Sequence, residues 1–457
     1  MKTRRALLLG TALLASTTGA LAQSAPAAPQ AWLGDRGIGE GIGIRAGGFE
    51  LHPGASAELG FDSNYFQRAG SPQEIAQVGG PASALHIRIT PTISLRTLEQ
   101  RIAEEDRQND RRLFAFDAAG RLSYNELLPF NGADAALFDS ARSLQGALSA
   151  TLDVARARVW SGQANAGYAY IFDPSNQGGY TSNFSRHVLD AGALARWRPG
   201  AGAFEWTVLR YALRLTLFDI DAFAYNDNQS HTLSSSGNWK FLPKTAFLYD
   251  ATAGVIRYRD QSPQNGGPWV NARLGLSGLL TQRFGLLTMV GWATSFYWNR
   301  NLAARNYDDF VANAEARFYL TPQTAPAAAY SNVSQPSLAV GYARSFQNGY
   351  LGDFFQQDRG YGQLRYLFGG RVVAKFEGGL SVINYPDFLL EGAPQTGFWE
   401  TRFDLMAFAE YRPSRVVGLN ATIHYDANVS QILEAPTYVD DLSFSRFRFF
   451  LGARWFL

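Results

Sequence analysis

The chain has 457 residues, no cysteine and a formal net charge of +2 at neutral pH. The absence of cysteine excludes disulfides and thiolate metal sites, and the near-neutral charge gives no support for nucleic-acid binding. Aromatic residues make up 14% of the chain, yet the mean hydropathy is only −0.16. This combination is typical of strands in which every second residue faces water.

The first residues have the pattern of a secretory signal peptide. Met1–Arg5 is basic, a short apolar run follows, and Ala20-Leu21-Ala22 is a small-x-small cleavage site. We therefore predict that residues 1–22 are removed after Ala22. Residues 23–48 are rich in alanine, proline and glycine without alternation, and are predicted to form a disordered periplasmic leader.

From Phe49 onward, apolar and polar residues alternate in segment after segment. The clearest is Leu85–Leu95, where Ile87 and Ile89 lie on one face and Arg88 on the other. Its length matches the ~9–11 residues that a tilted strand needs to cross a membrane. No apolar run reaches the ~18 residues of a helical span. With weaker segments near 56–65, 186–197 and 231–241, the pattern predicts about 18 strands, an even number as single-chain outer-membrane barrels prefer. The predicted fold is all-β, a transmembrane antiparallel outer-membrane barrel over residues 49–457.

The connections between these segments alternate between short and long. Short ones lie at 198–200, 242–244, 281–283, 369–370 and 412–414, and long polar ones at 173–180, 218–230, 260–267, 347–359, 385–400 and 427–441. Short periplasmic turns and longer external loops are typical of outer-membrane barrels. Segments 100–112 and 322–336 are long where a turn is expected. They are either hairpin extensions or signs of a miscounted strand pair.

The carboxyl terminus has an apolar residue at every second position. We interpret it as the last barrel strand and its membrane-insertion signal, formed by Phe447, Phe449, Leu451, Trp455 and Leu457. The expected partners are outer-membrane lipid and the barrel assembly machinery, and the expected location is the outer membrane of a Gram-negative cell.

The water-facing positions of the strands carry charges of both signs. The residues predicted to line the lumen and set its selectivity are Arg88, Arg96, Arg210, Arg214, Arg317, Lys375, Arg402, Arg446, Arg448, Arg454, Glu315, Glu377, Asp404 and Asp426. Mixed signs predict a weak ion preference rather than a strict filter. The arginines of the last strand form either a basic wall that guides anions, or ion pairs with Glu58 and Asp62.

Two short motifs resemble a known family. Leu51-His52-Pro53 followed by Gly60-Phe61-Asp62-Ser63-Asn64-Tyr65-Phe66 resembles the opening strand of the β-barrel porin 2 family, and Arg88-Ile89-Thr90-Pro91 resembles its second strand. The resemblance implies an outer-membrane barrel. Because some members are associated with exopolysaccharide or capsule export, it also implies periplasmic export components as partners. The family supplies no catalytic residues.

These observations lead to a channel for hydrophilic solutes, with polysaccharide secretion as the expected role. A general or sugar-selective diffusion porin is the alternative, and a sealed structural or adhesive barrel is a second one. An enzyme is not expected, since His424 beside Asp426 is the only suggestive pair and no serine motif accompanies it. No cofactor or metal is expected, although Asp308-Asp309 or Asp440-Asp441 could hold calcium.

Overall fold

The computed structural model describes most of the chain from Gly43 to the carboxyl terminus. The described residues are 43–70, 80–97, 113–172, 185–199, 204–242, 244–260, 265–298, 306–321, 336–348, 354–369, 371–390, 393–395, 397–414, 416–431 and 442–457. The predicted cleavage site at Ala20 and Ala22 lies outside them.

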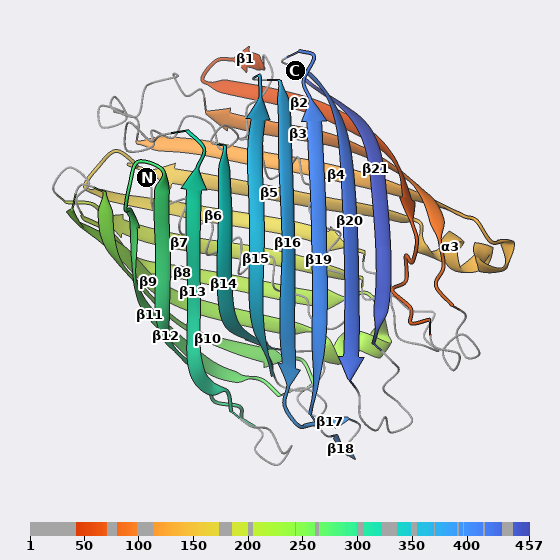
Figure 1. Ribbon diagram of the computed structural model, residues 1–457. Coiled ribbons are helices and arrows are strands. Elements are labelled where there is room, and N and C mark those ends of the chain that lie inside the picture. Colours follow the sequence, from red (N-terminus) through yellow and green to blue (C-terminus); the bar gives the residue numbers. More distant parts are fainter. Residues whose placement is uncertain are drawn as a thin grey trace.

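Eighteen antiparallel strands close into one barrel. The first half contains β2 (Phe49–Asp62), β3 (Ala84–Thr97), β4 (Phe114–Pro129), β5 (Ser143–Val154), β6 (Trp160–Ile171), β7 (Arg186–Trp197), β8 (Phe204–Phe218), β9 (Asn228–Leu242) and β10 (Thr245–Tyr258). The second half contains β11 (Gly267–Leu279), β12 (Phe284–Ser295), β13 (Asp308–Tyr319), β14 (Ser337–Asn348), β15 (Phe354–Phe368), β16 (Val372–Tyr385), β19 (Phe398–Tyr411), β20 (Val417–Gln431) and β21 (Phe444–Phe456). The strands run obliquely around the barrel (Figure 1).

The barrel closes where its first and last strands meet. β21 pairs with β2 over nine positions, from Gly54 opposite Phe456 to Asp62 opposite Arg448. The short strand β1 (Ile44–Ala46) pairs with the start of β2, and it lies at the same end of the barrel as the carboxyl terminus (Figure 1). The amide of Leu457 donates to the carbonyl oxygen of Pro53 at 3.0 Å. The closing pair leaves no free edge along most of β2 and β21.

The outer face of the barrel is apolar. Large side chains at alternate positions are exposed, with Leu148 and Val290 each 61% exposed and Leu274 55% exposed. Most of the inward-facing neighbours are polar or small, which reverses the arrangement of a soluble barrel. Among the described residues, no helix has the length and apolarity to cross a membrane. The fold is therefore a transmembrane-type antiparallel barrel, as the alternation predicts.

The connections fall into two sets at opposite ends of the barrel. The carboxyl terminus and β1 share one end with the turns after β5, β7, β9, β11, β15 and β19. The opposite end carries α3 (Ala135–Ala141), two short 3₁₀ segments, η2 (Gly132–Asp134) and η4 (Asp221–Asn226), and a hairpin of β17 (Phe388–Leu390) with β18 (Ala393–Gln395). We call these the short-turn end and the long-loop end.

The structure agrees with the predicted strand count and corrects some details. β3 pairs directly with β4, and β13 with β14, so the long segments at 100–112 and 322–336 do not hide a strand pair. Several strands run further into the predicted long loops than expected: β15 begins at Phe354 and β20 extends to Gln431. The predicted leader is described only from Gly43, where it includes β1. The sequence did not indicate α3.

Candidate functional site

The inner wall of the barrel is the candidate site. We define it as the strand positions between the exposed apolar residues, and every charged residue predicted to line the lumen occupies such a position. Arg402 and Asp404, for example, flank Phe403, which is 40% exposed on the outside. The residues of the predicted insertion signal occupy the opposite face: Phe447, Leu451 and Trp455 are exposed, while Phe449 is half-buried. Leu457 follows the end of β21.

The part of the wall around the closing strands is a dense set of ion pairs. Arg446 binds Asp62 through two nitrogens, with Nε 3.0 Å from Oδ1, and both side chains are almost fully buried. Arg88 binds Glu58 at 2.7 Å, and Asn420 donates to the same carboxylate at 3.3 Å. These arginines are thus neutralised by Glu58 and Asp62 and do not form a basic wall.

The remaining arginines of β21 are neutralised by the strands on the other side. Arg448 binds Asp426 of β20 at 2.6 Å, and Arg454 forms an ion pair with Glu410 of β19. Arg454 and Glu410 are each only 1% exposed. A charge buried this deeply requires a partner, so these pairs hold the wall together and are not available to a solute.

A second group of paired charged side chains lies on β13 to β16. Arg317 binds Glu315 at 2.7 Å, and the hydroxyl of Tyr361 donates to the same carboxylate at 2.8 Å. Tyr361 lies on β15 and reaches Glu315 across β14, where Gly341 leaves the space that its ring occupies. A Cβ on Gly341 would stand 2.3 Å from Cζ of Tyr361. Tyr361 was not among the predicted residues, because a contact across an intervening strand leaves no signal in the sequence.

Arg359 is another lumen residue that the prediction omitted. It binds Asp404 at 2.7 Å and reaches Glu377 at 3.4 Å, while Gln363 donates to Glu377 at 2.9 Å. Two of the predicted carboxylates thus share one arginine. Its position between outward-facing Asp358 and exposed Gly360 follows the same parity rule that found the others.

The wall from β4 to β9 has a different character. Its inner positions hold small residues at mid-barrel: Ala147, Ser149, Gly167, Ala169, Gly192, Ala212, Thr232 and Ser234. The one ion pair near them, Arg214 with Asp190, is open to solvent, with side chains 45% and 38% exposed. Much of this side of the inner wall is therefore lined by small side chains at mid-barrel.

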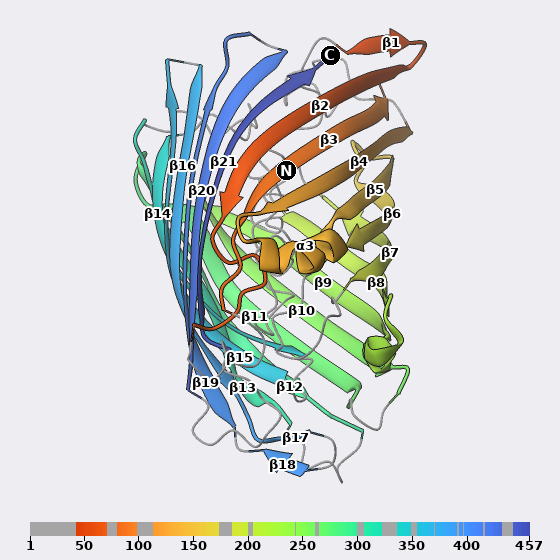
Figure 2. The ribbon, with the colours of Figure 1, turned by 90° about the vertical axis from the view of Figure 1, so that its right-hand side faces the viewer.

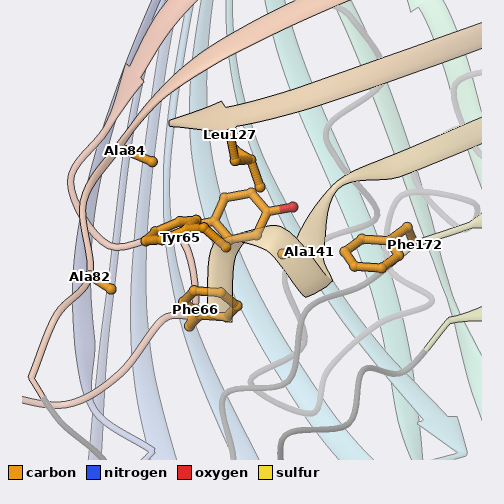
Figure 3. Close-up of a cluster of buried hydrophobic side chains, with 8 residues drawn as sticks. Tyr65, Phe66, Ala82, Ala84, Leu127, Ala141 and Phe172 are labelled. Atoms are coloured by element: carbon orange, nitrogen blue, oxygen red, sulfur yellow. The ribbon is translucent and has the colours of Figure 1, made fainter. Parts of the chain in front are cut away.

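Apolar side chains from the loops and strand ends pack together at the long-loop end of the barrel. Tyr65, Phe66, Ala82, Ala84, Leu127, Phe138, Ala141 and Phe172 form a buried apolar cluster, which we call the mouth cluster (Figure 3). The rings of Phe66 and Phe138 are 5.1 Å apart, and α3 lies against the segment that follows β2 (Figure 2). The guanidinium of Arg446 lies 5.6 Å from the centre of the Tyr65 ring, which places the cluster over the inner wall.

The family-like motif Asp62–Phe66 organises this mouth. Asp62 accepts from the amide of Asn64 at 3.1 Å while it binds Arg446. The buried side chain of Asn64 donates to the carbonyl oxygens of Arg68 and Ser445 at 2.8 and 3.1 Å. Ser63 accepts from the amide of Phe447 at 2.8 Å. The motif therefore ties the turn after β2 to the last strand and presents Tyr65 and Phe66 to the cluster.

The alternative sites weighed from the sequence are not assembled in the described residues. Asp426, the neighbour of His424, is bound by Arg448 and does not orient the histidine. Asp308 accepts from the indole nitrogen of Trp292 at 2.6 Å, and Asp309 pairs with Arg344, so this acidic pair is divided between separate partners. Asp440-Asp441 lies outside the described residues.

Comparison with known proteins gives only distant matches. No family model and no curated protein sequence matches the chain, so the likeness to the β-barrel porin 2 family remains a resemblance of two strands. The chain is similar to OpdK from Pseudomonas aeruginosa at 10% identity and a TM-score of 0.43, covering 89% of this chain and 99% of that one. It is similar to OccAB3 from Acinetobacter baumannii at 12% identity and a TM-score of 0.44, over 89% and 99% of the two chains. The siderophore receptor PirA from Pseudomonas aeruginosa matches at 10% identity and a TM-score of 0.40, over 89% and 80%. Similarities at this level indicate no substrate for this chain.

Proposed function

We propose that the protein is an outer-membrane channel through which hydrophilic solutes diffuse. The observation that carries this proposal is the contrast between the two faces of one closed barrel. The outer face exposes large apolar side chains all round, as a lipid-facing surface does, while the inner face is polar. A barrel of about 18 strands has a lumen wide enough for water and small solutes.

The wall from β4 to β9 is the route that such solutes take. Many of its inner side chains at mid-barrel are small, and the Asp190–Arg214 pair there is open to solvent. By contrast, the ion pairs around the closing strands are buried, so they stabilise the barrel without exposing free charge to the solute.

A diffusion channel is favoured over a conduit for polysaccharide secretion. The secretion role rested on the resemblance of the first two strands, and no family model matches the chain. A free channel also requires no periplasmic partner, whereas a conduit does.

Single-channel recording in planar bilayers tests the proposal. The purified full chain should insert and give steady ohmic steps in potassium chloride, without any added partner. A barrel that is correctly folded, as judged by circular dichroism and gel mobility before and after heating, but that gives no steps would contradict free diffusion. That result would favour a sealed barrel or a conduit that opens only with its partners.

A further inference from the structure

Two lumen arginines differ from all the paired ones described above. Arg121 of β4 and Arg210 of β8 lie on the inner wall, flanked on the outer face by Leu122 and by Leu209 and Tyr211, which are exposed. In the described residues, neither guanidinium has a hydrogen bond or an ion pair with a carboxylate. The charged group that acts electrostatically on Arg121 is another cation, Arg88. The group that acts on Arg210 is Asp250, which is itself bound by Arg273 at 3.0 Å.

The position of these two arginines in the barrel brings their positive charge close to a passing solute. Both arginines belong to the wall of small residues, and Arg121 is exposed while Arg210 is half-buried. On the other walls, Glu58, Glu315 and Asp426 each bind an arginine. Arg121 and Arg210 therefore place positive charge without a carboxylate partner on the side of the lumen that is lined by small side chains.

The register places the two arginines at about the same level. Cα partners lead from Arg121 through Ala147, Ala169 and Val188 to Thr216 on β8. Barrel strands tilt by roughly 35–45° from the barrel axis and lie ~4.8 Å apart. Residues at the same height along the axis are therefore offset from register partners by about one residue for each strand crossed. Between β4 and β8 these offsets add up, so the residue of β8 at the same height as Arg121 is not Thr216 but lies within about two residues of Arg210.

Small residues lie on the wall between the two arginines, and the side chain of Asn165 on β6 lies over one of them, Gly192. Ser149, Gly167 and Gly192 lie near the same level on β5, β6 and β7. The two backbones are separated by roughly 20–25 Å along this wall, which is too far for both to grip one small anion. Each guanidinium presents a planar set of donors that matches an oxyanion, so two anions, or the two ends of an elongated dianion, can be bound at once.

We propose that Arg121 and Arg210 make the channel selective for anions and bind solutes that carry carboxylate or phosphate groups. This inference rests on the proposed function, because it assigns a solute class to the same lumen. Two unpaired charges within a Debye length of a solute in a water-filled pore change its relative permeability by about fivefold at low salt.

Reversal potentials across a gradient of potassium chloride test the inference. The wild-type channel should pass chloride in preference to potassium, and R121Q/R210Q should lower that permeability ratio about fivefold, with each single variant in between. The matched control is D190N/R214Q, which removes an ion pair from the same wall without changing the net charge, and should leave the ratio unchanged. The inference would be overturned if R121Q/R210Q kept the wild-type ratio of chloride to potassium permeability, or if D190N/R214Q lowered that ratio by the same factor.

Equilibrium binding separates this inference from the proposed function. Titration of the detergent-solubilised barrel with succinate and, separately, with inorganic phosphate should show weak binding that R121Q/R210Q reduces about tenfold, as the loss of charge-assisted hydrogen bonds predicts. Binding without any conductance would defeat the diffusion channel and leave the anion site standing. Conductance without anion preference or binding would defeat the anion site alone. A response to only one of the two titrants would identify the oxyanion.

Discussion

Substitution of Asp62 by asparagine should destabilise the barrel strongly without changing the volume of the side chain. The Asp62 side chain is fully buried and that of Arg446 is 6% exposed, with contacts of 3.0 and 3.1 Å from Nε to the two carboxylate oxygens. An opposite charge at ~3 Å with an effective dielectric constant of ~20 is worth about 5 kcal/mol. Measured losses for one partner of a buried pair are about 3–5 kcal/mol. We therefore expect D62N to lower the free energy of unfolding by about 3–5 kcal/mol.

Urea unfolding in detergent micelles, followed by tryptophan fluorescence and by gel mobility, measures this loss. The control is D190N, which breaks the exposed pair with Arg214 and should cost less than about 1 kcal/mol. The double variant D62L/R446M replaces the buried pair by apolar side chains of similar size and should recover most of the stability. A loss in D62N no larger than that in D190N would refute the view that the closing strands depend on this pair.

Three further predictions concern packing. Phe138→Ala removes an aromatic ring of α3 from the mouth cluster, at a local cost of about 3–5 kcal/mol. The conductance should rise and proteolysis near α3 should become faster. An unchanged conductance and proteolysis rate would show that α3 does not narrow the mouth. Leu451→Arg places a charge on the outer face of β21 and should cost about 2–4 kcal/mol in lipid vesicles, whereas Leu451→Phe should be neutral; equal stabilities would mean that this face does not meet lipid. Gly341→Ala displaces Tyr361 from Glu315 and should lower the free energy of unfolding by about 1–3 kcal/mol. The control is Gly360→Ala, which has no atom within 4 Å of its added methyl group and should leave the free energy of unfolding unchanged. Both variants are unfolded in the same detergent.

The repeating pattern of the strands could be predicted from the sequence because each strand carries its own period. Leu85–Leu95 alternates without reference to any other segment, and β7 (Arg186–Trp197) begins and ends where the pattern predicted. The parity of a strand also assigns each charged residue to a face. Arg121 could have been assigned to the lumen in this way, from its position next to Leu122.

The partners of these charged residues could not be predicted. In the register, Arg446 lies directly opposite Asp426 and Arg448 lies directly opposite Asp62. The ion pairs are nevertheless diagonal, Arg446 with Asp62 and Arg448 with Asp426, so only the side-chain contacts of the folded barrel show the partners. The mouth cluster has the same limitation, since Phe138 and Phe66 come from separate loops with no shared period. Which arginines remain free is a property of the closed barrel as a whole.

The contact between the first and last strands also constrains the order of assembly. Asp62 and Arg446 are 384 residues apart in the sequence, so almost all of the intervening strands must be added to the sheet before the two residues can meet. Closing a loop of that length carries a large entropic cost that no local contact offsets beforehand. Until β21 docks, β2 presents an unpaired edge, and Asp62 remains a solvated carboxylate that leaves the turn at Asn64 without its anchor. A chain that loses its last strand would therefore have neither a closed wall nor an ordered entrance, which makes completion of the carboxyl terminus a checkpoint for the entire molecule.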